Sequence, residues 1–140
     1  MIVVIDANRL FPIIIAKRLH SASMDIFFCD ETELYAPFRL LAELEKNRDE
    51  IRLKSGFSYE DFNNFVSVVK LRIKFIPLED FVNKVSEAEI ISPHSKDIEY
   101  FALALKLNCA IWSDEKAFKK QSKVKVFNTS ELLKELGLKK

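Results

Sequence analysis

The sequence predicts an α/β fold with a central, mostly parallel sheet. Ile2–Ile5 is a short run of β-branched residues, as in a strand that is covered on both faces. Strand-like and helix-like segments then alternate along the chain, which is typical of a parallel sheet with helices packed on it. The 140 residues, 49% of them hydrophobic and only 2 of them Gly, suffice for a single domain over residues 1–140.

Apolar spacing and boundary residues predict the elements of the first part of the chain. Apolar runs predict strands, apolar residues three or four apart predict helices, and Pro or Ser-Gly marks their ends. The expected order is a strand over Ile2–Ile5, a helix over Leu10–Leu19 capped by Asn8, strands over Ile26–Cys29 and Leu34–Ala36, and a helix that starts with Pro37 and runs to about Leu53.

The second part of the chain continues the alternation. Ser58 and Asp61 form a sequence that resembles a capping box, and Asn128 with Glu131 repeats it near the end of the chain. The expected order is a helix after Ser58, a strand over Arg72–Ile76 closed by Pro77, helices over Leu78–Ile91 and from His94–Ser95, strands over Cys109–Trp112 and Val124–Phe127, and a helix that ends at Gly137.

Composition excludes several classes of protein. With 22 basic and 21 acidic residues the net charge is +1, so the chain is not a nucleic-acid binder held by bulk positive charge, and the basic stretch over residues 119–125 is most simply a solvated face. Two Cys and two His residues make neither a disulfide framework nor a zinc site. Without a membrane-length apolar stretch or an export signal, we expect a cytoplasmic protein that does not contact the membrane.

Acidic side chains are expected at one edge of the sheet. Asp6 follows the first strand, and Asp114 and Glu115 follow the strand over Cys109–Trp112. In parallel α/β sheets, ligands bind beyond the carboxyl ends of the strands, so these acids should lie near a ligand. Taken singly, Asp6 and Asp114 each have a structural interpretation as a helix cap.

Two further acids belong to helices. Asp97 lies in the first turn of the helix after Ser95, which such folds can direct at the same edge, although an acid in a first turn is also favoured by the helix dipole alone. Glu43 lies among apolar residues of Leu40–Leu44, or else on the surface beside Lys46. Together the acids favour a site for a hard divalent cation, Mg²⁺ or Mn²⁺, and phosphodiester hydrolysis as its chemistry.

Four segments carry a resemblance to a known family. They resemble in order and spacing the acidic motifs of PIN-domain nucleases, and the phrases around Asp97 and Trp112 are similar to a stand-alone prokaryotic subfamily related to the toxin ribonucleases of toxin–antitoxin operons. The resemblance covers nearly the whole chain. The segments are Val4–Asn8, Leu41–Leu44, Lys96–Ala104 and Ile111–Lys116.

The resemblance implies a fold, an activity and partners. It implies a three-layer α/β/α sandwich and metal-dependent cleavage of single-stranded RNA, with Glu43 binding metal or orienting the attacking water. Many relatives dimerise, so a homodimer is expected, and the toxin members are silenced by a small antitoxin protein. The implied ligands of Mg²⁺ or Mn²⁺ are Asp6, Asp97 and the pair Asp114 and Glu115, and the implied supporting residues are Asn8 and Ser113.

The chain departs from the family pattern at one position. The expected Asp column holds Glu115, and Asp114 occupies the column before it, so either residue is the candidate ligand. The departure and the neutral charge favour an alternative, a weak or inactive PIN-like module that binds nucleic acid or protein. A phosphatase or receiver domain ranks third, because Asp6 is followed two residues later by Asn8 instead of a second Asp.

Overall fold

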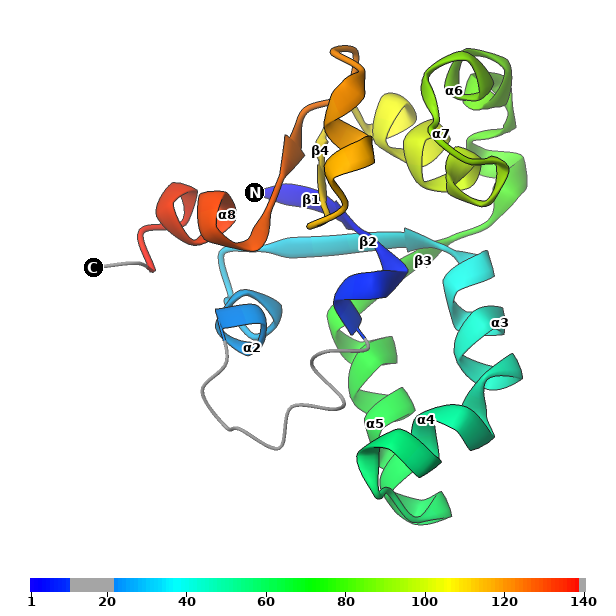
Figure 1. Cartoon of the computed structure of the whole chain (residues 1–140), viewed down its shortest axis with the longest axis vertical. Helices are drawn as coiled ribbons and strands as arrows, with labels where there is room; N and C mark the ends of the chain where they lie inside the picture. The colour runs from blue at the N-terminus through cyan, green and yellow to red at the C-terminus, as the bar shows by residue number, and fades with distance from the viewer. Residues whose placement is uncertain (11–21, 139–140) are drawn as a thin grey trace.

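The computed structural model describes residues 1–10 and 22–138. Its centre is a sheet in which all five strands are parallel, in the order β3-β2-β1-β4-β5 (Figure 1). The first strand of the chain is thus the middle strand of the sheet, and the predicted parallel α/β fold is confirmed. The strands are β1 (Ile2–Ile5), β2 (Glu33–Pro37), β3 (Ile73–Ile76), β4 (Ala110–Trp112) and β5 (Val126–Phe127).

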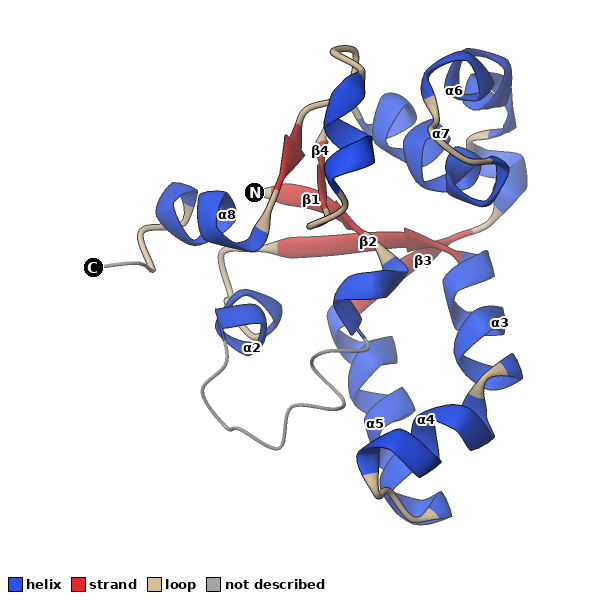
Figure 2. Cartoon of the chain, viewed as in Figure 1, coloured by secondary structure: helices blue, strands red, loops and turns tan. Residues whose placement is uncertain are grey.

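Helices cover both faces of the sheet and make a three-layer sandwich (Figure 2). Figure 1 shows α6 and α7 on one side, with α2 and α5 on the other. None of the described helices is long and apolar enough to cross a membrane. The helices are α2 (Ala22–Phe27), α3 (Phe38–Lys46), α4 (Arg48–Ser55), α5 (Tyr59–Arg72), α6 (Val85–Ile91), α7 (Ile98–Leu107) and α8 (Thr129–Glu135).

The helix α7 is the central element of its layer. It packs on β1, β2 and β4, and its residues from Tyr100 to Ala104 are all buried. Such a run leaves no polar face, as expected for a helix enclosed between a sheet and a second helix, here α6. The helix ends at Asn108, whose φ of 51° is a left-handed conformation that Asn tolerates better than most residues.

Local capping sets the starts of α5 and α8, as the sequence predicts. The Ser58 hydroxyl accepts a hydrogen bond from the Asp61 N–H at 3.0 Å, and the Asp61 carboxylate accepts one from the Ser58 N–H at 3.1 Å. Asn128 and Glu131 make the same reciprocal pair at the start of α8, at 2.8 and 2.9 Å. Each box gives two otherwise unpaired N–H groups a partner.

The strand predicted over Ile26–Cys29 is wrong, because the structure forms α2 there. Ile26 and Phe27 are fully buried while Phe28 is half exposed, which fits one covered face of a helix. Both neighbouring positions beside β1 are taken by β2 and β4, so the sheet has no place next to β1 for a further strand.

Three helix predictions also need correction. Residues 7–10 are already helical, so Asn8 does not cap that helix, and the rest of the expected span, residues 11–19, lies outside the described residues. The helix expected to run to Leu53 breaks at Asn47, whose side chain donates to the Glu43 carbonyl at 2.9 Å. The span Leu78–Ile91 holds two 3₁₀ helices, η1 (Leu78–Asp80) and η2 (Val82–Lys84), before α6.

Candidate functional site

Asp6 and Ser113 are brought together by the register of two neighbouring strands. Ile5 of β1 pairs with Trp112 of β4, so the residues that follow them leave the sheet side by side. The Ser113 hydroxyl donates a hydrogen bond to Asp6 Oδ2 at 2.8 Å, and the Asp6 side chain is almost fully buried. A carboxylate is thus held in the protein interior at the carboxyl edge of the sheet, where parallel folds bind ligands.

The surroundings of Asp6 disfavour its charge. The pKa of Asp6 is raised to about 6, mainly by burial and further by the charges of Asp97 and Glu115, against the opposing effect of hydrogen bonds from Ser113 and the Asn8 backbone. A cation bound beside this carboxylate would offset all three unfavourable effects.

Asp97 reaches the same edge from a different layer. It ends the short 3₁₀ helix η3 (Ser95–Asp97), which leads directly into α7, and only 7% of the residue is exposed. Its Oδ2 atom is buried and has no hydrogen-bond partner among the described residues. Burial raises the pKa of Asp97, although the positive charges of Lys96 and His94 act against this. Buried carboxylate oxygens normally have a hydrogen-bond or metal partner, so this oxygen is placed to bind a ligand.

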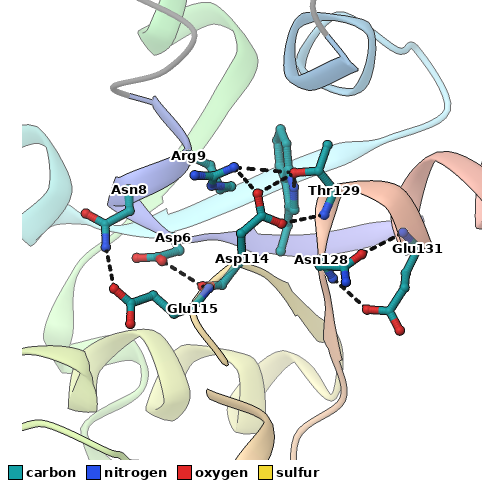
Figure 3. A network of polar contacts seen from close by, with 10 residues as sticks. Asp6, Asn8, Arg9, Asp114, Glu115, Asn128, Thr129 and Glu131 are labelled. Carbon is teal, nitrogen blue, oxygen red and sulfur yellow. Dashed lines mark hydrogen bonds and ion pairs between the residues drawn. The ribbon is translucent and has the colours of Figure 1, made fainter. Parts of the chain in front are cut away.

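Glu115 completes the group of acids around Asp6. Its side chain accepts a hydrogen bond from Asn8 Nδ2 at 3.2 Å, and its backbone N–H donates to the Ser113 hydroxyl at 3.1 Å. Its charge raises the pKa of both Asp6 and Asp97. Figure 3 shows Glu115 extended toward Asn8, with Asp6 nearby.

Asp114 precedes Glu115 in the turn after β4, and both of its carboxylate oxygens are bound by other residues. Its carboxylate pairs with the Arg9 guanidinium and accepts hydrogen bonds from the Thr129 N–H at 2.7 Å and the Thr129 hydroxyl at 3.0 Å (Figure 3). The same hydroxyl accepts from Trp112 Nε1 at 3.1 Å. These contacts tie the end of β4 to the start of α8, and they direct the Asp114 carboxylate away from Asp6.

Glu43 faces a cleft of about 280 Å³ instead of the protein interior. Arg39 lies one turn earlier on α3 and donates to Glu43 Oε1 at 2.9 Å, and its other end reaches Glu99 of α7 at 3.5 Å. Burial alone would lower the pKa of Arg39, but Glu43 and Glu99 raise it above its ordinary value. The cleft is lined by Asp6, Ala7, Asn8, Arg39, Glu43, Lys46, Asn47, Lys96, Asp97 and Tyr100.

Sequence reasoning missed three residues that organise the site. Arg39 stands four residues before Glu43, a helical spacing that predicts an ion pair, so its role was readable once α3 was assigned. Arg9 lies 105 residues before Asp114 in the chain and Thr129 lies 15 residues after it. No short sequence motif links either residue to Asp114.

The donor set fits a hard divalent cation. Among the described residues, no three His, Cys, Asp or Glu side chains are grouped so that they could hold a metal ion as they lie. Three observations nevertheless fit a bound cation: the charges of Asp97 and Glu115 act on Asp6, Asp97 Oδ2 is buried without a partner among the described residues, and the charge on Asp6 is disfavoured. Carboxylate oxygens are the ligands that Mg²⁺ and Mn²⁺ prefer.

Comparisons with known proteins identify the family. A model of the PIN domain matches residues 4–137. Among solved structures, the chain is similar to the crystal structure of VapBC2 from Rickettsia felis bound to a DNA fragment from their promoter, with a TM-score of 0.65, 15% identity and coverage of 91% of this chain and 98% of that chain. No curated protein matches. At 15% identity the structural likeness shows the fold, whereas the family match spans nearly the whole sequence. The protein therefore belongs to the PIN-domain family, whose members are generally nucleases.

Proposed function

We propose that the protein is a metal-dependent ribonuclease that hydrolyses phosphodiester bonds of single-stranded RNA. The observation that carries the proposal is the pair of buried carboxylates at the carboxyl edge of the sheet, Asp6 with its raised pKa and Asp97 with an unpartnered oxygen. Membership of a family of nucleases supports the same conclusion.

We assign Asp6, Asp97 and Glu115 as the residues that would hold Mg²⁺ or Mn²⁺. When bound, such an ion lowers the pKa of water and neutralises charge on the phosphate and the leaving oxygen. Ser113 orients Asp6, and Asn8 orients Glu115, through the hydrogen bonds described above. Asp114 is a structural residue in this assignment, because Arg9 and Thr129 already occupy its oxygens.

Glu43 is placed to act on water rather than to complete the buried group. It lines the same cleft as Asp6 and Asp97, but its carboxylate is hydrogen-bonded to Arg39 of the same helix, α3. From this position an ionised carboxylate can accept the hydrogen bond of an attacking water and orient it. The cations of Lys46 and Lys96 also line the cleft and suit the charge of a phosphate backbone.

We further propose that the protein forms a homodimer and works with an antitoxin partner. The similarity of fold to VapBC2, a toxin–antitoxin complex, supports the partner, and the resemblance of the motifs to toxin ribonucleases supports both. A small DNA-binding protein encoded beside this one and co-purifying with it would be the expected partner. A chain that purifies alone, with no such neighbour, would contradict the toxin assignment and leave the nuclease assignment standing.

The nuclease proposal is tested with a fluorescent single-stranded RNA in Mg²⁺, in Mn²⁺ and in EDTA. We expect cleavage with either ion, none in EDTA, and losses of about a hundredfold or more in Asp6→Asn, Asp97→Asn and Glu115→Gln, the scale on which single charge-stabilising groups act in active sites. Glu60→Gln, an exposed acid on α5 outside the cleft, is the matched control.

Metal binding separates the nuclease from the inactive alternative. Titration calorimetry with Mn²⁺ should show binding to the native protein and none to Asp6→Asn. If Mn²⁺ does not bind and RNA stays intact, the protein is a PIN-like binding module. Full cleavage by a pure Asp6→Asn protein would refute the assigned site.

A further inference from the structure

Tyr100 has a buried hydroxyl group that nothing in the described structure satisfies. It lies on α7 and is 3% exposed, and its Oη atom has no hydrogen-bond partner among the described residues. Its side chain nonetheless lines the cleft that contains Asp6, Glu43 and Asp97. Tyr100 follows three residues after Asp97, the residue that precedes α7, and both side chains line the same cleft. The unsatisfied hydroxyl therefore borders the space where a substrate would lie.

The Tyr100 hydroxyl is a hydrogen-bond donor without an acceptor in the described structure. Burial raises the pKa of the Tyr100 phenol above its ordinary value, and the nearby charges of Glu43 and Asp6 raise it further, so the group is protonated at neutral pH. Buried polar atoms without a partner are rare in native proteins, and each one is disfavoured unless a ligand or water supplies the partner. The carboxylates of the cleft do not accept a hydrogen bond from Tyr100 in the described structure, so we expect a ligand to bring the acceptor oxygen.

The remaining walls of the cleft indicate which acceptor this is. Arg39, Lys46 and Lys96 line it with positive charge beside the three carboxylates already described, and Arg39 is paired with Glu43 and Glu99. Lys46 and Lys96 have no ion pair with the described acids at 4 Å or less. A non-bridging phosphate oxygen is negatively charged and accepts hydrogen bonds without needing to donate one. It matches both the free cations and the unpaired donor.

We propose that Tyr100 is a substrate-binding residue whose hydroxyl donates a hydrogen bond to a phosphate oxygen of the RNA strand in this cleft. The inference rests on the proposed function for the identity of the strand. It adds to the acidic residues a neutral donor that helps to place the phosphate, and it explains why a hydroxyl is present at an otherwise apolar stretch of α7.

The test compares Tyr100→Phe with the native protein, because this change removes only the oxygen atom. Binding of a fluorescent single-stranded RNA of about ten nucleotides is followed by anisotropy in EDTA, so that no cleavage interferes. We expect affinity to fall by about tenfold, as for one hydrogen bond to a charged group. Tyr35→Phe is the matched control, since Tyr35 is a half-buried tyrosine of β2 that does not line the cleft.

Thermal unfolding without RNA distinguishes a ligand contact from a structural role. The melting temperature of Tyr100→Phe should equal or exceed that of the native protein, because the lost hydroxyl had no partner. A clearly lower melting temperature would overturn the proposal, since it would show that the hydroxyl is bonded within the protein. Unchanged RNA affinity would overturn it as well, including the case in which only the rate of cleavage falls.

The two proposals fail separately. If the native protein binds RNA in a Tyr100-dependent way but never cleaves it, the ribonuclease assignment fails and the binding residue stands. If RNA is cleaved and Tyr100→Phe binds it normally, the reverse holds. If the native protein neither binds nor cleaves RNA, both are refuted.

Discussion

The ionised form of Asp6 destabilises the folded protein in the absence of a bound cation. Its pKa of about 6 in the folded protein lies above the value of 3.8 for an unperturbed carboxyl, so the folded state binds the proton more tightly than the unfolded state does. The contribution of Asp6 to the free energy of unfolding is therefore greatest below about pH 4, falls as pH rises from about 4 to about 6, and changes no further above that. This sign is opposite to that of most salt-bridged carboxylates.

Replacing Asp6 by Asn should stabilise the metal-free protein at neutral pH. A pKa shift from 3.8 to about 6 corresponds to a penalty on the order of 3 kcal/mol for the ionised group, and Asn removes it while it can still accept the Ser113 hydrogen bond. Chemical denaturation in EDTA near pH 7 and near pH 4 measures this. The gain should vanish at the lower pH. A less stable Asp6→Asn protein near pH 7 would contradict the account.

Substitutions of the adjacent acids Asp114 and Glu115 should have different effects on cleavage and on stability. Glu115→Gln should abolish cleavage and leave stability nearly unchanged, because the hydrogen bond that its side chain accepts from Asn8 is exposed. Asp114→Asn should retain cleavage, because the amide oxygen can still accept the Thr129 N–H and keep the end of β4 tied to α8. It should lower the free energy of unfolding by about 1–3 kcal/mol, because the Arg9 guanidinium, whose side chain is largely buried, loses its charged partner. Denaturation and RNA cleavage measured on both variants test the assignment, and exchanged phenotypes would make Asp114 the ligand.

Sequence alone places Asp6 and Asp97 but leaves this pair undecided. Asp6 follows a strand whose pattern is unmistakable, and Asp97 precedes a helix with a dense apolar run, so their positions follow from element order. Asp114 and Glu115 are neighbours in a turn, and their side chains diverge. Which one faces Asp6 depends on Arg9 and Thr129, whose contacts form only in the folded chain.

At the scale of elements, the correct predictions depended on short-range chemistry. The boxes at Ser58 and Asn128 were readable because each involves residues three apart whose partners are in the same turn. The helix α2 was not, because a four-residue apolar run fits a buried strand and a buried helix face equally well. The break at Asn47 depends on a single side-chain hydrogen bond within a helical sequence.

The capping box of α8 has a consequence for the site. Asn128→Ala should lower the free energy of unfolding by about 1 kcal/mol, the usual cost of losing a cap. Because Thr129 is the first residue of that helix and holds Asp114, the change should also loosen the end of β4. Ser58→Ala, which removes the equivalent cap of α5, is the matched control. We expect equal destabilisation, measured by denaturation, with reduced cleavage only in Asn128→Ala. Equal cleavage in both would show that α8 does not position the turn.

At the scale of the whole molecule, the topology was predictable and the surface was not. The parallel class follows from alternating strands and helices, and it places Asp6 and Ser113 at one edge of the sheet in adjacent strands. The cleft, by contrast, is formed by side chains from several elements, α3 and α7 among them, that meet only after folding, so the place of Tyr100 in it does not follow from the sequence.

Because the net charge is only +1, RNA affinity should come from the cleft and not from the overall field of the protein. Lys46 and Lys96 each neutralise about one phosphate in this view. The logarithm of affinity for single-stranded RNA should then fall with the logarithm of salt concentration, and removing both lysines should reduce that slope by about 1.4.

Anisotropy titrations over a range of salt concentrations check this with Lys46→Met/Lys96→Met. The matched control is Lys120→Met/Lys123→Met, which removes the same charge from exposed residues that are not among those lining the cleft. We expect the cleft variant to bind RNA weakly with a shallow salt slope, and the control to bind with the native slope, because Debye screening limits the influence of charges outside the cleft. A shallow slope in the control and a native slope in the cleft variant would instead place the RNA along the basic stretch at residues 119–125.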